Sequence, residues 1–305
     1  MKKMLFVFNP HSGTGAISKH LLQVLDIFTK YGYEVVAYPT QASRDGENKI
    51  IADGMRFDRI VAAGGDGMLH ELANGVLRLP EPVEVGYIPM GTVNDFAFST
   101  RIPRTVPEAA ALAASGRIKA LDVGNFGGRY FAYVAAFGIA TNASYDTDQR
   151  AKNRWGFLAY ASNALRGIEL PNLDANCREM TIRAGDQVLE GRFVFGSLSN
   201  SRSIGGMTNL VAKDVELDDG LLDGLFIRLP KSLHELDRLR SSLMVRNFDS
   251  ECMHFIRAES FEIESEPTDW TLDGEWGGEH TKVHVSTEKL VLRIALPEEE
   301  EKNEK

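Results

Sequence analysis

The sequence has few cysteines and no long apolar run. Its 305 residues include only two cysteines, Cys177 and Cys252, which excludes a disulfide framework and a cysteine-rich metal site. The longest apolar run, Phe131–Ala140, is well short of the roughly 18 residues needed to span a bilayer. The apolar stretch Met4–Phe8 is also too short for a secretory signal. We therefore expect a cytoplasmic protein with no transmembrane segment, in which both cysteines pack as small buried hydrophobes.

The sequence also lacks an excess of positive charge. Its net charge is −9, and the last nine residues, with five Glu and two Lys, contribute −3 of it. Such a balance excludes a general nucleic-acid binder, whose affinity rests on Lys and Arg at phosphates. It also excludes attachment to anionic lipid by charge alone. Residues 297–305 are predicted to be a disordered acidic tail.

Strands and helices alternate in the first 122 residues. We expect strands at Met4–Phe8, Glu34–Tyr38, Arg59–Ala63 and Val83–Ile88, and helices at Ile17–Tyr31, Asn48–Met55 and Leu69–Leu77. This rhythm with short connections predicts a doubly wound parallel sheet. Ligands of such sheets bind outside the carboxyl ends of the strands. The loops after the first, third and fourth strands are therefore the expected place of chemistry.

The pattern changes beyond residue 122. Short strand-like segments separated by turn signals dominate residues 123–296, among them Phe255–Glu264, Lys282–Val285 and Leu290–Ala295. Two helices are expected among them, near Trp155–Gly167 and at Leu233–Val245. This organisation predicts a second, β-rich domain, most simply a sandwich.

Three loops at the expected strand ends suit phosphate binding. They are Asn9–Gly15, Gly64–Gly67 and Pro89–Ala97. Glycine-rich turns before a helix expose backbone N–H groups and the positive end of the helix dipole. Asp66 suits a phosphate that arrives with Mg²⁺. Each loop alone also fits a plain tight turn, with Asp66 or Asp95 as a helix cap, but three at one sheet edge indicate a nucleotide site.

Two acidic clusters stand out in the second part. Five carboxylates crowd into ten residues: Asp214, Glu216, Asp218, Asp219 and Asp223. Their density suits Mg²⁺ or Ca²⁺, and it equally suits a solvated turn. In the second cluster, Leu272-Asp273-Gly274-Glu275, a carboxylate can accept a proton from an attacking hydroxyl. A polar hairpin turn is the alternative there.

Taken together, these motifs carry a resemblance. The residues Asn9-Pro10-His11-Ser12-Gly13, Gly64-Gly65-Asp66-Gly67 and Pro89 to Ala97 resemble the bacterial diacylglycerol-kinase-like lipid kinases. That family includes the catalytic domains of eukaryotic diacylglycerol, sphingosine and ceramide kinases. The resemblance implies an α/β nucleotide domain over residues 1–122, similar to NAD kinases and phosphofructokinases. It also implies a C-terminal β-sandwich with inserted helices over 123–296, and an active site in the cleft between them.

The resemblance also implies roles for individual residues. It assigns nucleotide binding to residues of the loops and strand ends, namely Asn9, Ser12, Gly13, Thr40, Gly64, Gly65, Asp66, Gly67, Thr92, Asn94, Asp95 and Asp122. It assigns a structural Mg²⁺ to Glu216, Asp219 and the Leu221 carbonyl. The proton acceptor is Glu275, with Asp273 as its partner or as the competing candidate.

The implied reaction is phosphoryl transfer with ATP and Mg²⁺ as cofactors. The γ-phosphate of ATP passes to a lipid hydroxyl, that of diacylglycerol or a related lipid. The partner is thus a lipid substrate, met transiently at the inner membrane surface by a protein that binds no nucleic acid. Whether the chain forms a homodimer is left open.

One position departs from the family motif. Gly-Gly-Asp-Gly is usually followed by Thr, and here position 68 is Met. The lost hydroxyl removes a hydrogen bond worth roughly 1 kcal/mol, so weaker ATP binding, another phosphate donor or reduced activity are alternatives. A second reading is an NAD kinase, which shares the Gly64–Gly67 loop. A third is a nucleotide- or lipid-binding protein without kinase activity.

Overall fold

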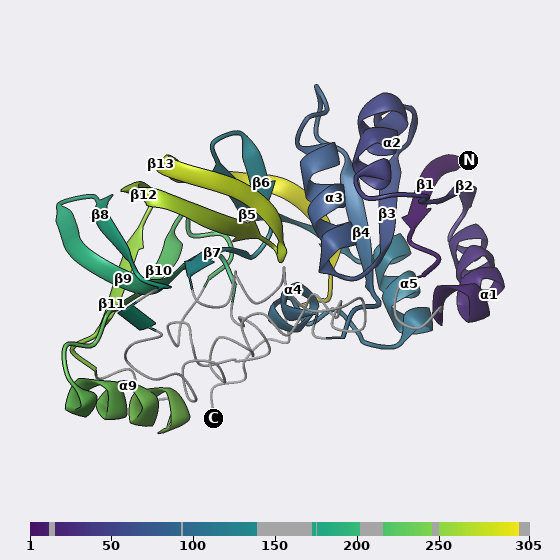
Figure 1. Cartoon of the computed structure of the whole chain (residues 1–305). Helices are drawn as coiled ribbons and strands as arrows, with labels where there is room; N and C mark the ends of the chain where they lie inside the picture. The colour runs from purple at the N-terminus through teal and green to yellow at the C-terminus, as the bar shows by residue number, and fades with distance from the viewer. Residues whose placement is uncertain are drawn as a thin grey trace, which may run out of the picture. The chain divides into compact units, whose positions relative to one another are not determined.

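The computed structural model describes residues 1–11, 16–92, 94–138, 173–174, 176–201, 216–245 and 250–298. The chain divides into two units, Met1–Leu121 with Leu290–Lys305, and Asp122–Lys289. Ser12, Gly13, Asp214, the helix expected near 155–167 and most of the expected acidic tail lie outside the described residues. The two units are shown in Figure 1 and are described one at a time.

The first unit contains a parallel sheet, as predicted. Its strands are β1 (Lys2–Phe8), β2 (Tyr33–Pro39), β3 (Arg59–Gly64) and β4 (Glu84–Pro89). They are ordered β4-β3-β1-β2 and paired in parallel. All of β3 is buried, because both faces of such a sheet are covered and its central strands read as continuous apolar runs.

Helices connect these strands. They are α1 (Ala16–Lys30), α2 (Asp45–Asp53) with the short 3₁₀ turn η2 (Gly54–Arg56), α3 (Asp66–Val76), α4 (Asp95–Ser99) and α5 (Val106–Ser115). α2 packs on α3, and α1 packs on α5 (Figure 1). α5 also lies very close to β4, since a Cβ at Gly86 would stand 2.6 Å from the Cβ of Ala113. Glycine at position 86 therefore sets the distance between helix and sheet.

The second unit is rich in strands. They are β5 (Arg117–Phe126), which begins in the first unit, β6 (Arg129–Phe131), β7 (Val134–Gly138), β8 (Arg178–Ala184), β9 (Gln187–Ser199), β10 (Leu222–Arg228), β11 (Met253–Ala258), β12 (Ser260–Leu272) and β13 (Glu275–Leu296). The order is β11-β10-β9-β7-β12-β13, and β8 also pairs with both β9 and β12. β7 and β8 thus share one position between two long strands. Helix α9 spans Leu233–Val245, as predicted.

The core of the second unit is aromatic. Trp270 is 1% exposed, and its ring lies 5.0 Å from that of Phe126 and 4.9 Å from that of Phe137. Phe193, Phe226 and further apolar side chains from β7 to β13 complete one hydrophobic cluster. The structure thus shows a strand-rich second part, and its classification as a sandwich stays a prediction.

Two expected boundaries differ from the structure. The segments Lys282–Val285 and Leu290–Ala295 belong to one continuous strand, β13. The end of that strand returns to the first unit, where Ile294 pairs in parallel with Val85 of β4. Residues 290–296 therefore belong to the α/β unit, although the sequence pattern placed them in the second domain.

Candidate functional site

The loops after β1, β2, β3 and β4 begin at one edge of the parallel sheet. Phe8 is in register with Pro39 of β2 and with Ala63 of β3. Gly64 of β3 is in register with Pro89 of β4. The sheet register therefore brings the starts of the three predicted phosphate loops to the same edge, as the sequence pattern predicted.

Asn9 and Thr40 both lie at the end of β1: Asn9 follows the strand, and Thr40 is bonded to its last residue, Phe8. The Asn9 side-chain oxygen accepts a hydrogen bond of 2.9 Å from the backbone N–H of His11, which forms a turn directly after the strand. Thr40 is buried, and its backbone N–H donates to the carbonyl of Phe8 over 2.9 Å. Both residues thus shape the loop edge through local hydrogen bonds.

The second and third loops contact one another through their backbones. The N–H of Met90 donates to the Gly64 carbonyl over 2.8 Å. A Cβ at Gly91 would stand 3.1 Å from the Cα of Gly65. The same Cβ would stand 2.7 Å from the side-chain oxygen of Asn94, so the close packing of the two loops leaves no room for a side chain at position 91.

Asn94 closes the third loop on itself. Its side-chain oxygen accepts from the Gly91 N–H over 2.8 Å, and its amide donates to the Gly91 carbonyl over 2.7 Å. Asn94 adopts the left-handed conformation, with φ 56°, at the N-cap of α4. Asp95 then begins α4 and is buried, while Thr92 is exposed. The side-chain amide of Asn94 therefore holds the loop.

Asp66 begins helix α3 and is 0% exposed. The N-cap of this helix is Gly65, so the interpretation of Asp66 as the cap is wrong. A carboxylate in the first turn of a helix is stabilised by the helix dipole. The dipole thus supports a buried negative charge at the centre of the loop edge.

Met68 is buried against the start of α2. It is 6% exposed, and its sulfur would lie 3.4 Å from a Cβ built on Gly46. The side chain that replaces the usual Thr thus packs between α3 and α2. This packing gives the departure from the family motif a structural explanation inside the α/β unit.

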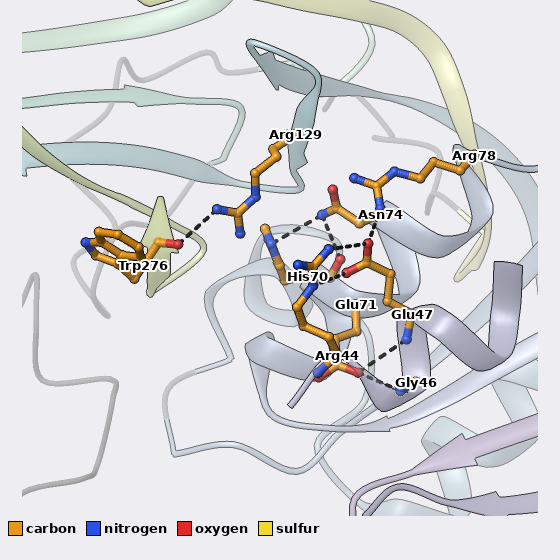
Figure 2. Close-up of polar contacts among 9 residues, drawn as sticks. All are labelled: Arg44, Gly46, Glu47, His70, Glu71, Asn74, Arg78, Arg129 and Trp276. Atoms are coloured by element: carbon orange, nitrogen blue, oxygen red, sulfur yellow. Dashed lines mark hydrogen bonds and ion pairs between the residues drawn. The ribbon is translucent and has the colours of Figure 1, made fainter. Parts of the chain in front are cut away.

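A second carboxylate of α3, that of Glu71, caps helix α2. We call Glu71 and its three partners, Arg44, Gly46 and Glu47, the Glu71 cluster. Glu71 accepts hydrogen bonds from the backbone N–H groups of Arg44 at 2.9 Å, Gly46 at 2.8 Å and Glu47 at 3.3 Å (Figure 2). The N-cap residue, Arg44, makes no capping hydrogen bond with its own side chain. Glu71 therefore does from α3 what a capping side chain does locally.

Glu47 joins the same helices through ion pairs. Its carboxylate accepts hydrogen bonds from Arg44, at 3.2 Å, and from Arg78 (Figure 2). Burial raises the pKa of Glu47, but Arg44, Arg78 and His70 outweigh it, so the pKa lies below its usual value. Glu47 is thus charged at neutral pH and ties α2 to the end of α3.

In the second unit, Asp122 holds the acidic turn. Its carboxylate accepts a hydrogen bond of 2.6 Å from the N–H of Gly220, and its own N–H donates to the Leu217 carbonyl over 2.9 Å. Asn200 donates to the Asp122 carbonyl over 2.8 Å. The structure therefore brings Asp122 together with the stretch that carries the predicted metal ligands.

Two cations of the chain balance this turn. Arg257 donates to Asp219 over 2.8 Å and pairs with Asp223 at 3.4 Å. Lys289 bonds to Glu259 over 2.6 Å, and this bond, together with the charges of Asp122 and Asp219, raises its pKa. Burial raises the pKa of Asp223. Arg257 lowers this pKa and the charge of Asp219 raises it, and the net pKa lies above its usual value.

The predicted Mg²⁺ ligands are thus partly engaged by the protein. The other oxygen of Asp219 accepts from the N–H of Leu221 over 3.0 Å, and Glu216 is exposed. Within the described ranges, no group of three or more His, Cys, Asp or Glu is arranged to hold a metal ion. A structural Mg²⁺ at this turn stays a prediction.

Asp273 and Gly274 form the two-residue turn between β12 and β13. Their φ angles are 50° and 82°, and Leu272 pairs with Glu275. Two left-handed residues make a type I′ hairpin, for which Asp-Gly is a favoured sequence. The hairpin alternative for this stretch is therefore confirmed, with Asp273 in the turn and Glu275 directly after it.

The two carboxylates of this hairpin differ in their surroundings. Asp273 is 1% exposed and accepts backbone hydrogen bonds from Ala132 at 2.7 Å, Tyr133 at 3.0 Å and Val134 at 3.1 Å. We call these residues the Asp273 cluster. Glu275 is half-buried. The structure thus separates two residues that the sequence left as competing candidates.

Sequence reasoning missed Glu71, Glu47, Arg257 and Lys289. Each acts on a partner distant in sequence, as Glu71 does on residues 24 to 27 positions away. The only local signal was the position of Glu71 one helical turn beyond the Gly64–Gly67 loop.

Comparisons with known proteins place the chain in a class. A family model of the diacylglycerol kinase catalytic domain matches residues 3–126. The diacylglycerol kinase of Bacillus subtilis (strain 168) is 34% identical, with 91% of each chain covered. That of Staphylococcus saprophyticus is 33% identical, over 91% of this chain and 90% of the relative.

Solved structures agree in fold. A diacylglycerol kinase structure from Bacillus anthracis str. Sterne superposes with a TM-score of 0.80 at 22% identity, covering 97% of each chain. A second structure from that organism gives a TM-score of 0.85 at 23% identity, over 97% of this chain and 95% of the other. The chain belongs to the diacylglycerol kinase family, a family of lipid kinases. In the described part of the chain, no helix has the length and apolarity to span a membrane.

Proposed function

We propose that this protein is an ATP-dependent lipid kinase that phosphorylates the hydroxyl of diacylglycerol or a related lipid. The observation that carries the nucleotide assignment is the backbone contact between the Gly64–Gly67 and Pro89–Ala97 loops at Gly65 and Gly91. A side chain is excluded at position 91, so a phosphate can approach the backbone of the two glycine-rich loops closely. Family membership supports a lipid as the acceptor.

The first unit would hold the nucleotide. Backbone N–H groups of the loops and the first turn of α3 favour negative phosphate oxygens. The buried carboxylates of Asp66 and Asp95 are hard oxygen ligands of the kind that Mg²⁺ prefers. When bound with ATP, Mg²⁺ would neutralise charge on the phosphates. Asp66 and Asp95 would thus keep the nucleotide's metal at the loop edge.

Glu275 of the second unit would serve as the base. The lipid hydroxyl attacks the γ-phosphorus, its proton passes to the Glu275 carboxylate, and the bond to the β-phosphate oxygen breaks, so that ADP leaves. Most of the acceleration in such transfers comes from positioning and from electrostatic stabilisation. Placement of the active site in a cleft between the units stays a prediction.

The acceptor is tested with the purified protein and radiolabelled Mg-ATP. Diacylglycerol, phosphatidylglycerol and a sphingoid base are offered in mixed micelles, and NAD is offered in solution. We expect labelled product from diacylglycerol or a related lipid. Product from NAD alone would contradict the proposal, and ATP binding without product from any acceptor would favour the binding-protein alternative.

The nucleotide site is tested with a matched pair of variants at the two ends of β3. Asp66→Asn removes the buried charge at the loop edge, and Asp58→Asn removes an exposed charge before the strand. We expect Asp66→Asn to lower turnover at least 100-fold and to weaken Mg-ATP binding, measured by calorimetry. Asp58→Asn should stay within twofold of wild type. Equal effects of the two variants would remove Asp66 from the site.

A further inference from the structure

We infer that Asp273 is a positioning residue, which holds the hairpin that carries Glu275, and that it does not act as the base. The inference rests on the proposed function, because it concerns the base of that reaction. Its grounds are the contacts of the Asp273 carboxylate and the second attachment of the same hairpin.

The Asp273 carboxylate faces protein backbone. Both of its oxygens accept hydrogen bonds from the successive N–H groups of Ala132, Tyr133 and Val134, at 2.7 to 3.1 Å. The Asp273 N–H donates in turn to the Val134 carbonyl over 2.8 Å. Three backbone N–H groups thus occupy the two oxygens through which a base would accept the proton of a substrate hydroxyl.

The other side of the turn is attached to the same segment. Arg129 of β6 donates to the backbone carbonyl of Trp276 over 3.0 Å (Figure 2). Glu275 therefore lies between two residues, Asp273 and Trp276, that are both bonded to residues 129–134. This double attachment fixes the backbone of Glu275 while its side chain remains half-buried.

A second hairpin of the same unit shows that a two-residue turn does not need such contacts. Gly185 and Asp186 join β8 to β9, with Ala184 paired to Gln187. Asp186 is exposed. The polar residue of an ordinary hairpin faces water, so the burial of Asp273 points to a task beyond forming the turn.

The test combines Asp273→Asn, Glu275→Gln and the double variant, with Asp186→Asn as the matched control. Turnover is measured from pH 3.5 to 9, a range that spans the ordinary carboxyl values of about 4, and amide exchange of residues 132–134 is followed by mass spectrometry. We expect Glu275→Gln to lower kcat by about 10²–10⁴-fold with amide protection unchanged. Asp273→Asn should lower kcat by roughly 10–100-fold, lose the protection, and keep the acid limb of the pH profile.

The double variant separates positioning from a general loss of structure. If Asp273 acts through Glu275, its substitution adds less than about threefold once Glu275 is Gln, since coupled residues are not additive. A double variant in which the two losses multiply overturns the inference. So does an Asp273→Asn protein that loses the acid limb while Glu275→Gln keeps it, because Asp273 is then the base.

The two proposals fail separately. If the wild type phosphorylates no acceptor, the proposed function fails, and amide exchange remains readable without turnover. Unchanged protection of residues 132–134 in Asp273→Asn overturns the inference even in an active enzyme. Asp186→Asn should match wild type in both measurements.

Discussion

The Glu71 cluster in the first unit and the Asp273 cluster in the second use the same contacts in different surroundings. In each, one carboxylate accepts hydrogen bonds from three nearby backbone N–H groups. Glu71 is half-buried at a helix start, and the neighbouring Glu47 binds two arginines. Asp273 is almost fully buried, and its backbone is left-handed, with φ 50°. The chemistry is shared, and the access of water differs.

This difference decides what each carboxylate contributes. At the start of α2, the exposed Arg44 turns its N–H to water when Glu71 is removed, while Gly46 and Glu47 are buried, so only part of the contact is replaced. Enclosed N–H groups have no such replacement, and each unsatisfied donor costs about 1–3 kcal/mol. Ala132, Tyr133 and Val134 are all nearly fully buried. Removal of the two carboxylates should therefore have unequal effects.

The largest effect is expected for Asp273→Ala. It leaves three enclosed donors without their acceptor, and we expect the second unit to lose about 3 kcal/mol or more of its free energy of unfolding. Tryptophan fluorescence in urea reports this directly, because Trp155, Trp270 and Trp276 all belong to that unit. Asp186→Ala is the control. A loss below 1 kcal/mol would show that water does reach these donors.

Met68→Thr should have the next largest effect. It removes buried volume beside the Glu71 cluster, next to Gly46, and we expect a loss of about 2 kcal/mol. Circular dichroism in urea measures it, with the exposed Met55→Thr as control. ATP affinity, measured by calorimetry, should change less than twofold. Tighter ATP binding with unchanged stability would instead restore the idea of a missing phosphate ligand.

Glu71→Gln should cost about 1 kcal/mol, in the range of a lost helix cap. A carboxamide keeps one acceptor oxygen, so part of the three-fold contact on α2 is lost. Faster amide exchange confined to residues 44–48 would show the effect, and Glu81→Gln, in an exposed loop, provides the control. Exchange that spreads through β1 and β3 would mean that Glu71 supports the whole unit.

The smallest effect is a pH dependence from Glu47. Burial raises its pKa, but Arg44, Arg78 and His70 lower it further, so the folded pKa lies below the unfolded one. Such a group contributes stability above the ordinary Glu value of about 4.3 and loses it as the pH falls through the folded pKa. The Tm difference between wild type and Glu47→Gln should shrink from pH 6 to pH 3. A difference that grows on acidification would contradict the lowered pKa.

The sequence pattern predicted the elements that depend on local chemistry. The parallel strands follow from apolar runs, and helix α9 follows from leucines three residues apart at Leu233, Leu236 and Leu239. α2 begins at Asp45, three residues before the expected Asn48, because Glu71 of another helix caps it. The continuity of β13 escaped prediction, since the polar residues Ser286 to Lys289 look like a turn.

The candidate site was predictable in its loops and not in its carboxylate contacts. Parallel register alone brings the loops after β1, β3 and β4 to one edge. The donors of Asp273 lie 139 to 141 residues away in sequence, so no spacing rule relates them. The difference in burial between Asp273 and Glu275 also depends on the tertiary structure, so the sequence pattern does not predict it.

The return of β13 to the first unit has a consequence for protein synthesis. Val85 of β4 pairs with Ile294, while the intervening second unit, Asp122–Lys289, is translated first. At 5–20 residues per second, these roughly 170 residues take about 10–30 s to emerge. During that time β4 is an unpaired sheet edge, the surface on which nascent chains associate wrongly. The pairing of β4 with β13 therefore has to wait until the second unit has been translated.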